Sequence, residues 1–222
     1  MSDDARTAVL DRIRAAWKDR LPATPAAVSA DWEALPREYD QLPRLTIEAR
    51  LHMLEDRLRD YDAEVTRVAD HEVAGAIASV LAAHGNPPTL MPRGLPEHWI
   101  PVDSSITVDN GFSPRQLDHY KCVITGATTA IADTGSLVLQ GVPGQGRRAA
   151  TLVPDFHLCL ARVKDVVENV PQAFALIAST STLPITFVSG PSATADIEMT
   201  RIKGVHGPRF LHVLLVTSIP SA

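Results

Sequence analysis

The chain has 222 residues and a formal net charge of −5, from 21 Lys+Arg against 26 Asp+Glu. That length suits one sizeable domain with an extension, and the acidic balance argues against a protein that binds nucleic-acid phosphates or an anionic membrane surface. No apolar run reaches the roughly 18–20 residues that span a bilayer, and the N-terminus lacks the basic-then-apolar order of a signal peptide. We therefore expect a soluble, cytoplasmic protein.

The first third of the chain is its most charged part. Residues 1–72 hold 11 Lys+Arg and 16 Asp+Glu, which accounts for the whole net charge. This profile is typical of solvated helices attached to a better buried body. Apolar residues four apart predict a helix over 3–20, and four prolines exclude a continuous helix over 21–44. We predict an N-terminal helical and proline-rich extension, 1–44, followed by a domain over 45–222.

The domain shows alternating helix and strand patterns. Thr46 is expected to cap a helix with an apolar stripe at Leu51, Leu54 and Leu58. Further helices are predicted over 70–83, 114–120 and 163–177, and residues 92–112 as an irregular segment. Strands are predicted at 64–68, 89–91, 122–125, 130–132, 136–140, 157–161, 184–189 and 210–217. This alternation indicates an α/β fold, a layered sheet flanked by helices.

The two cysteines, Cys122 and Cys159, limit the redox and metal chemistry of the chain. An iron–sulfur cluster normally takes four thiolates, so we expect no cluster, no structural zinc and no other cofactor in this chain. Both cysteines fall in predicted strands, which favours buried, inert thiols over a nucleophile. The sequence contains no GxGxxG, Walker, HExxH or GxSxG motif.

Three glycine-containing segments are candidates for chemistry, and the first lies between two predicted strands. There, Asp133 and Thr134 can hydrogen-bond backbone amides and Gly135 permits a positive φ, so a tight turn explains the segment fully. The functional alternative is that Ser136 and the turn amides hold a polar group of a substrate. From the spacing alone we favour the turn.

The second segment, 190–198, follows the predicted strand 184–189. In α/β sheets ligands bind beyond the carboxyl ends of strands, and free amides at the start of a following helix attract anions. The residues that would serve such a site are a flexible glycine, two hydroxyls and two acids suited to proton transfer or cation binding: Gly190, Ser192, Thr194, Asp196 and Glu198. An N-capping turn with acids in the first helical turn is an equally good interpretation.

In the third segment His206 stands close to Gly204 and Gly207. Histidine titrates near neutrality and suits general acid–base work. The alternative is a turn whose imidazole bonds a backbone group, but we favour function because a core role would not need the glycines. We predict that the three segments converge on one pocket. The nearby Arg147 and Arg148 could neutralise a small anionic metabolite, although a solvated pair is the commoner explanation.

Four segments, in this order, resemble the LUD domain family: residues 130–137, 152–157, 190–198 and 204–208. The resemblance covers roughly residues 45–218. It implies a fold like that of the sugar-phosphate isomerase and CoA-transferase group, and a role in oxidising L-lactate to pyruvate beside two iron–sulfur partner proteins. It transfers no catalytic residue, so the site candidates rest on the residues themselves.

Two hypotheses follow for the function. In the first, the chain is a non-redox subunit of a lactate-oxidising complex, and iron–sulfur partners supply the electron acceptor that this chain lacks. In the second, it is a stand-alone small-molecule enzyme of the isomerase or acyl/CoA-transferase type. Co-purification with cluster-bearing partners would favour the first, and tight binding of a phosphorylated or CoA-linked metabolite the second.

Anaerobic reconstitution of the isolated chain with iron and sulfide is expected to yield no stoichiometric cluster, because two strand-borne cysteines cannot supply four thiolates. Iron and sulfide analysis after gel filtration measures this. A cluster retained by the monomer would contradict the prediction.

Overall fold

The polypeptide divides into two units, Met1–Tyr39 and Asp40–Ala222. The computed structural model describes residues 3–17, 24–102, 105–180, 182–195, 201–203 and 206–217. Within these ranges, no helix combines the length and the apolar character needed to cross a membrane.

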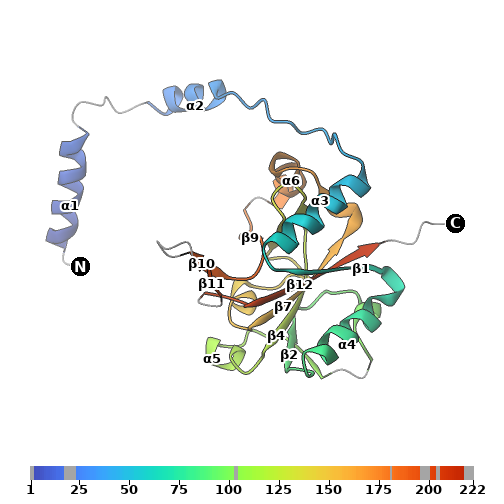
Figure 1. Ribbon diagram of the computed structural model, residues 1–222. Helices are drawn as coiled ribbons and strands as arrows, with labels where there is room; N and C mark the ends of the chain where they lie inside the picture. Colours follow the sequence, from blue (N-terminus) through green and yellow to red (C-terminus); the bar gives the residue numbers. More distant parts are fainter. Residues whose placement is uncertain are drawn as a thin grey trace. The chain divides into compact units, whose positions relative to one another are not determined.

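The first unit contains α1 (Asp3–Ala16) and α2 (Pro25–Ala34) (Figure 1). The helix expected over 3–20 is present as α1, whereas α2 was not predicted. Pro25 occupies the first turn of α2, where a missing backbone N–H costs nothing. The Thr24 hydroxyl accepts a hydrogen bond from the Ala27 N–H at 3.2 Å and caps the helix.

The second unit begins with α3 (Ile47–Asp60), the helix predicted from its cap and apolar stripe. The Thr46 hydroxyl accepts from the Ala49 N–H at 3.2 Å, and Leu51, Leu54 and Leu58 are buried. Arg67 on the following strand donates to the buried Glu55 of α3. The helix is therefore fixed to the sheet both by apolar burial and by a charge-assisted hydrogen bond.

A six-stranded parallel sheet forms the centre of this unit, in the order β1-β12-β7-β4-β2-β3 (Figure 1). The strands are β1 (Glu64–Ala69), β12 (Phe210–Thr217), β7 (Phe156–Arg162), β4 (Cys122–Gly126), β2 (Thr89–Met91) and β3 (Ile106–Val108). The predicted α/β class, a layered sheet flanked by helices, is confirmed. The short strand β3 was missed, because it lies inside the turn-rich stretch assigned as irregular.

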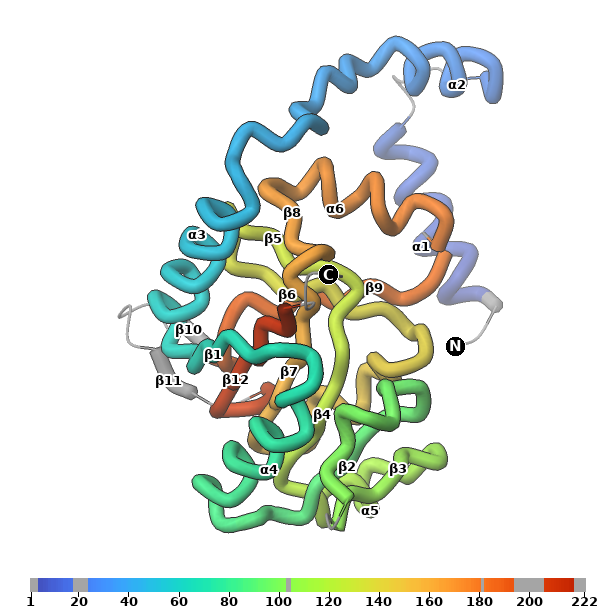
Figure 2. The backbone as a smooth tube through the Cα atoms, turned by 90° about the vertical axis from the view of Figure 1, so that its right-hand side faces the viewer, coloured from blue at the N-terminus to red at the C-terminus, as the bar shows by residue number. Residues whose placement is uncertain are grey.

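Side chains of the central strands alternate between two buried faces. On one face, Leu158 and Leu214 pack against α4 (Val73–Ala83). On the other, Cys159 and Val213 pack against α3 and a second sheet. Helices α3 and α4 thus lie on opposite sides of the sheet, as Figure 2 shows. Burial on both faces explains why β7 and β12 are almost continuously apolar.

The second sheet has four strands in the order β8-β5-β6-β9. They are β8 (Val166–Val167), β5 (Thr129–Ile131), β6 (Ser136–Gln140) and β9 (Ile185–Val188). Strand β6 runs antiparallel to both β5 and β9. Strand β9 is last in the strand order and is therefore an edge strand. Helix α6 (Val170–Ile177) covers this sheet through Ala173, which packs on Ile131 and Val138.

The helix predicted over 163–177 is correct only in its second half. Residues Val163–Asp165 form a 3-10 turn, η4, and β8 follows directly. Helix α6 starts later because the Asn169 side chain accepts from the Gln172 N–H at 3.1 Å and a proline stands in the first turn.

The remaining short elements are 3-10 turns, one short helix and a two-stranded ribbon. They are η1 (Asp70–Glu72), η2 (Glu97–Trp99), α5 (Pro114–Leu117), η3 (Arg148–Thr151), η5 (Ala178–Thr180), β10 (Ala193–Ala195) and β11 (Arg201–Lys203).

Deletion of residues 1–39 is expected to leave a cooperative thermal transition with a nearly unchanged melting temperature. Deletion through residue 45 should lower the melting temperature by a few degrees, because the Glu168 carboxylate accepts from the N–H groups of Arg44 at 2.7 Å and Leu45 at 2.8 Å. Circular dichroism melts of the two truncations and the full chain measure the difference. Non-cooperative unfolding after removal of 1–39 would show that the first unit belongs to the core.

Candidate functional site

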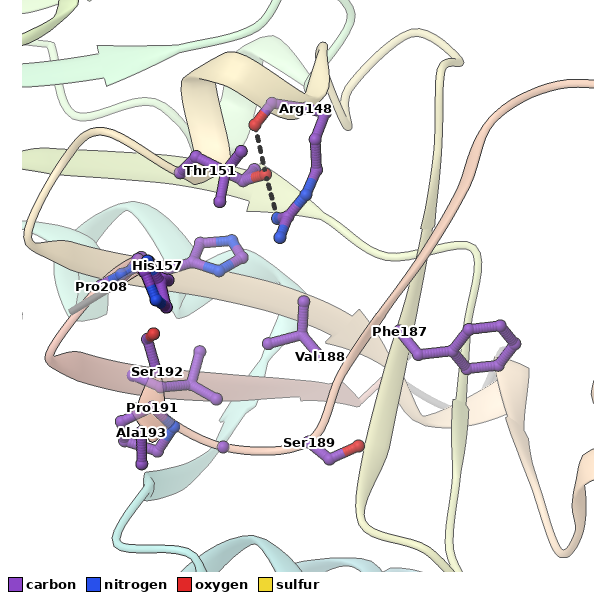
Figure 3. Close-up of a pocket in the computed structure, with 15 residues that line it drawn as sticks. Arg148, Thr151, His157, Phe187, Val188, Ser189, Pro191, Ser192, Ala193 and Pro208 are labelled. Carbon is purple, nitrogen blue, oxygen red and sulfur yellow. Dashed lines mark hydrogen bonds between the residues drawn. The ribbon is translucent and has the colours of Figure 1, made fainter. Parts of the chain in front are cut away.

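A pocket of about 270 Å³ lies at the amino ends of β7 and β12 (Figure 3). Its walls are His157 and parts of three segments, 148–152, 187–193 and 206–211. The sequence placed the second segment beyond the carboxyl end of the strand 184–189, and the pocket does adjoin the carboxyl end of β9. Its position at the amino ends of the central strands was not predicted. The loop after β9 belongs to the second sheet, and the carboxyl end of β9 meets the amino ends of the central strands.

Backbone and charged groups hold the pocket's loops together. The Ser192 N–H donates to the Pro208 carbonyl at 2.8 Å, and the Phe210 N–H donates to the Asp155 carbonyl at 3.2 Å. Arg209 donates to both carboxylate oxygens of Asp155, Nε to Oδ1 at 2.6 Å and Nη2 to Oδ2 at 2.5 Å. These hydrogen bonds hold the pKa of Asp155 below its usual range, so the bridge is intact at neutral pH.

Four of the predicted site residues line this pocket: Gly190, Ser192, His206 and Gly207. Gly190 has a positive φ of 106°, and a Cβ there would lie 2.6 Å from the Cβ of Tyr61. Glycine is thus required for the loop to pass α3. Two of the three segments singled out in the sequence therefore do meet.

The first segment reaches the pocket only indirectly. Ser136 is buried, and its Oγ lies 2.6 Å from the Oγ of Ser189, which lines the pocket. Asp133, Thr134 and Gly135 are not among the lining residues. Gly135 has φ of 60° and packs against Arg57, where a Cβ would lie 2.6 Å from the arginine Cβ. The tight-turn interpretation accounts for these three residues.

Residues Ala193–Ala195 form a strand, β10, so the expected helix does not begin directly after Pro191. Strand β10 pairs antiparallel with β11, with Thr194 opposite Ile202. The alternation of small and β-branched residues suits an extended ribbon better than a helix. Asp196, Glu198 and Gly204 lie outside the described residues, as does the side chain of Thr194.

His157, which sequence reasoning did not select as a site residue, is the most buried polar group of the pocket, with 2% of its surface exposed. Its Nε2 lies 2.7 Å from the Thr125 Oγ1, and the same hydroxyl lies 3.7 Å from the Cys159 Sγ. A hydroxyl has one hydrogen, and the tautomer of His157 follows its direction. With that hydrogen on the sulfur, Thr125 accepts from a protonated Nε2 and the Nδ1 of a neutral His157 carries a lone pair.

His157 is neutral at physiological pH. Burial of the ring and, secondly, the nearby positive charge of Arg148 lower the pKa of His157 to about 4. The sequence did contain a signal for it: a lone histidine in the apolar strand 156–161 must find a polar partner. Thr125, the polar residue in the apolar strand β4, is that partner.

The two adjacent arginines have different surroundings. Arg147 donates to both Asp109 carboxylate oxygens, from Nε at 2.8 Å and Nη2 at 3.1 Å. The Arg148 guanidinium donates to the Thr151 hydroxyl at 3.2 Å, and it has no carboxylate partner within the described ranges. Figure 3 shows Arg148 and His157 extending into the same space. Arg147 is therefore a structural ion pair, whereas Arg148 is available to an anion.

The arrangement suits recognition of a small anionic molecule. The pocket offers a guanidinium without a carboxylate partner among the described residues, a neutral imidazole and the hydroxyls of Thr151 and Ser192. Burial raises the pKa of the Cys122 and Cys159 thiols to about 12, so both are protonated and inert, as expected. No group of three metal-binding side chains is found among the residues that the structure describes.

This mixed α/β architecture, with a mostly parallel central sheet flanked by helices, matches a known class of protein. Residues 107–216 match the LUD domain, a range that includes every described pocket residue. A crystal structure titled as a DUF162 family protein from Deinococcus radiodurans superposes with a TM-score of 0.67 at 34% sequence identity. The match covers 78% of this chain and 99% of that one.

Two curated relatives share a name. The protein named lactate utilization protein C from Deinococcus radiodurans is 40% identical over 187 residues, which cover 83% of this chain and 87% of that protein. One of the same name from Geobacillus thermodenitrificans is 27% identical over 207 residues, covering 81% and 86%. The chain belongs to the LUD domain family.

Wild-type protein is expected to lose stability relative to His157→Gln as the pH falls from 6.5 to 4. The pKa of His157 is lowered on folding, so the unfolded chain binds a proton in this window that the folded chain does not. A shift of this size corresponds to about 3 kcal/mol of unfolding free energy, present above pH 6.5 and lost on acidification.

Urea denaturation at pH 7, 5.5 and 4 measures this difference. Glutamine can still donate to Thr125, so the variant is expected to fold at neutral pH. A parallel decline of both proteins with pH would show that His157 is not the titrating group.

Proposed function

We propose that this chain is the subunit without a cluster in a cytoplasmic system that oxidises L-lactate to pyruvate beside iron–sulfur partner subunits. The observation that carries the proposal is the 40% identity, over 83% of this chain, to a protein named lactate utilization protein C. The match to the LUD domain over 107–216 supports it further, because that range contains the pocket residues.

The electron balance of the reaction supports a role beside redox partners. Oxidation of the lactate hydroxyl to the pyruvate carbonyl removes two electrons and two protons. The chain has two cysteines, and both are buried thiols, so it cannot supply a four-thiolate cluster. In this proposal the electrons pass to clusters in the partner subunits, and this chain binds and orients the metabolite.

The charge of the pocket agrees with this division of labour. Lactate is a small monoanion, and the guanidinium of Arg148 is a cation with a hydroxyl partner at 3.2 Å. A pocket of about 270 Å³ holds a three-carbon acid with room for ordered water. A stand-alone isomerase or acyl/CoA transferase is the competing function, and the following experiment separates the two.

In a host without other lactate dehydrogenases, deletion of this chain is expected to abolish growth on L-lactate while growth on pyruvate continues. The tagged chain, purified anaerobically from cells, should bring down iron–sulfur proteins. That complex should reduce an artificial electron acceptor when given L-lactate, and adding back the chain should restore activity to a preparation that lacks it.

If the deletion strain oxidised lactate at the wild-type rate, the proposed function would be refuted. Turnover of a sugar phosphate or a CoA thioester by the purified chain alone would instead support the competing enzyme. The pyruvate-grown strain serves as the control for general effects on growth.

A further inference from the structure

The pocket combines the cation Arg148 with the neutral imidazole of His157. Arg148, at its upper rim in Figure 3, presents N–H donors only, whatever the pH. The neutral His157 ring, by contrast, has one donor and one acceptor nitrogen, and its surroundings decide which is which.

The guanidinium of Arg148 is held in place, and no carboxylate neutralises it within the part of the chain that the structure describes. Its Nη1 donates to the Thr151 hydroxyl, and that hydroxyl donates back to the Arg148 carbonyl at 3.1 Å. Both groups belong to η3, the turn that precedes β7. The two residues also border a second hollow of about 300 Å³, so the guanidinium is accessible. A carboxylate can therefore bind here without displacing an existing ion pair.

The direction of one buried hydrogen, on the Thr125 hydroxyl, decides the tautomer of His157. The hydroxyl is fully buried between the ring and the Cys159 sulfur. When its hydrogen is directed to the sulfur, its lone pairs face the His157 Nε2 at 2.7 Å and the ring proton lies on Nε2. Among the described residues nothing donates to Nδ1, so in that tautomer this nitrogen is an acceptor for a group in the pocket.

We infer that the Thr125 hydrogen is directed to Cys159 and that the pocket binds a small 2-hydroxycarboxylate, with its carboxylate on Arg148 and its hydroxyl donating to the Nδ1 of His157. In this arrangement the pocket discriminates against the corresponding 2-oxocarboxylate. The substrate hydroxyl can donate its hydrogen to the lone pair on Nδ1. The carbonyl oxygen of the 2-oxo acid has no hydrogen to donate, so its lone pairs and that of Nδ1 would repel each other. The inference rests on the proposed function for the identity of the acid, and it assigns the residues that recognise it.

The pocket therefore binds the substrate of the oxidation more tightly than its product. The substrate carries the donor that His157 requires, and the oxidised product does not. The product therefore leaves a buried acceptor unpaired, and a desolvated unpaired acceptor weakens binding. His157 acts here as a specificity-determining residue, and Thr125 as the positioning residue behind it.

Nuclear magnetic resonance titrations of the full-length chain with sodium L-lactate, pyruvate and propionate test the inference. L-lactate is expected to bind roughly five- to tenfold more tightly than pyruvate or propionate, as one hydrogen bond to a buried acceptor allows. Arg148→Ala should weaken all three acids at least about tenfold, since a charge-assisted contact is lost. Arg148→Lys, which keeps the charge, should restore part of the affinity.

The His157 variants separate recognition from structure. His157→Phe keeps a flat ring in the apolar strand but removes the acceptor, so lactate binding should fall to the level of propionate, while propionate binding stays unchanged. Thr125→Val should narrow the preference for lactate over pyruvate, and Thr125→Ser should retain it. Long-range proton–nitrogen correlation spectra should show the proton of His157 on Nε2.

Equal affinity for the three acids, no binding of any, or a proton on Nδ1 would overturn the inference. The proposed function would be untouched by these results if removal of the chain still abolished lactate oxidation. Conversely, lactate oxidation that persists without the chain would refute the proposed function, while the titrations would still report how the pocket selects its acid.

Discussion

Strand β12 is held between β1 and β7, and this insertion places the loop 206–209, to which Ser192 and Asp155 are hydrogen-bonded. The strand comes last among the described elements but stands inside the sheet, paired in parallel on both sides. Its residues 211–216 are buried, so neither its register nor its direction can change without exposing apolar surface. The register places Phe210 opposite Phe156 and brings the loop 206–209 to the start of β7.

The polar interior of the pocket follows from the cost of burying a histidine. An unpaired imidazole in an apolar strand is costly, and the hydrogen bond between His157 and Thr125 removes most of that cost. The Thr125 hydroxyl also sets the tautomer of the ring by the direction of its hydrogen, so one contact bears on both stability and recognition. Burial and, secondly, the positive charge of Arg148 keep the ring neutral, and among the described groups no carboxylate balances that charge.

The range that matches the LUD domain, 107–216, contains the described pocket but not the whole core. Helices α3 and α4 and strand β1 precede it, and they cover both faces and one edge of the sheet. Apolar burial at Leu54 and Ile77 stabilises each face by about 1.5–3 kcal/mol per side chain. The described pocket residues thus all come from 107–216, whereas the sheet that supports them is completed by the residues before 107.

Local patterns in the sequence were sufficient for the α/β class, the cap at Thr46, the buried cysteines and the turn at Gly135, because each depends on neighbours a few residues away. The helix wrongly extended over 163–177 shows the limit, since apolar spacing alone does not separate a strand from a helix. The pocket's place at the amino ends of β7 and β12, and the selection of His157 over more conspicuous residues, required the fold. Both arise from pairings between distant strands, whose direction and register no local pattern encodes.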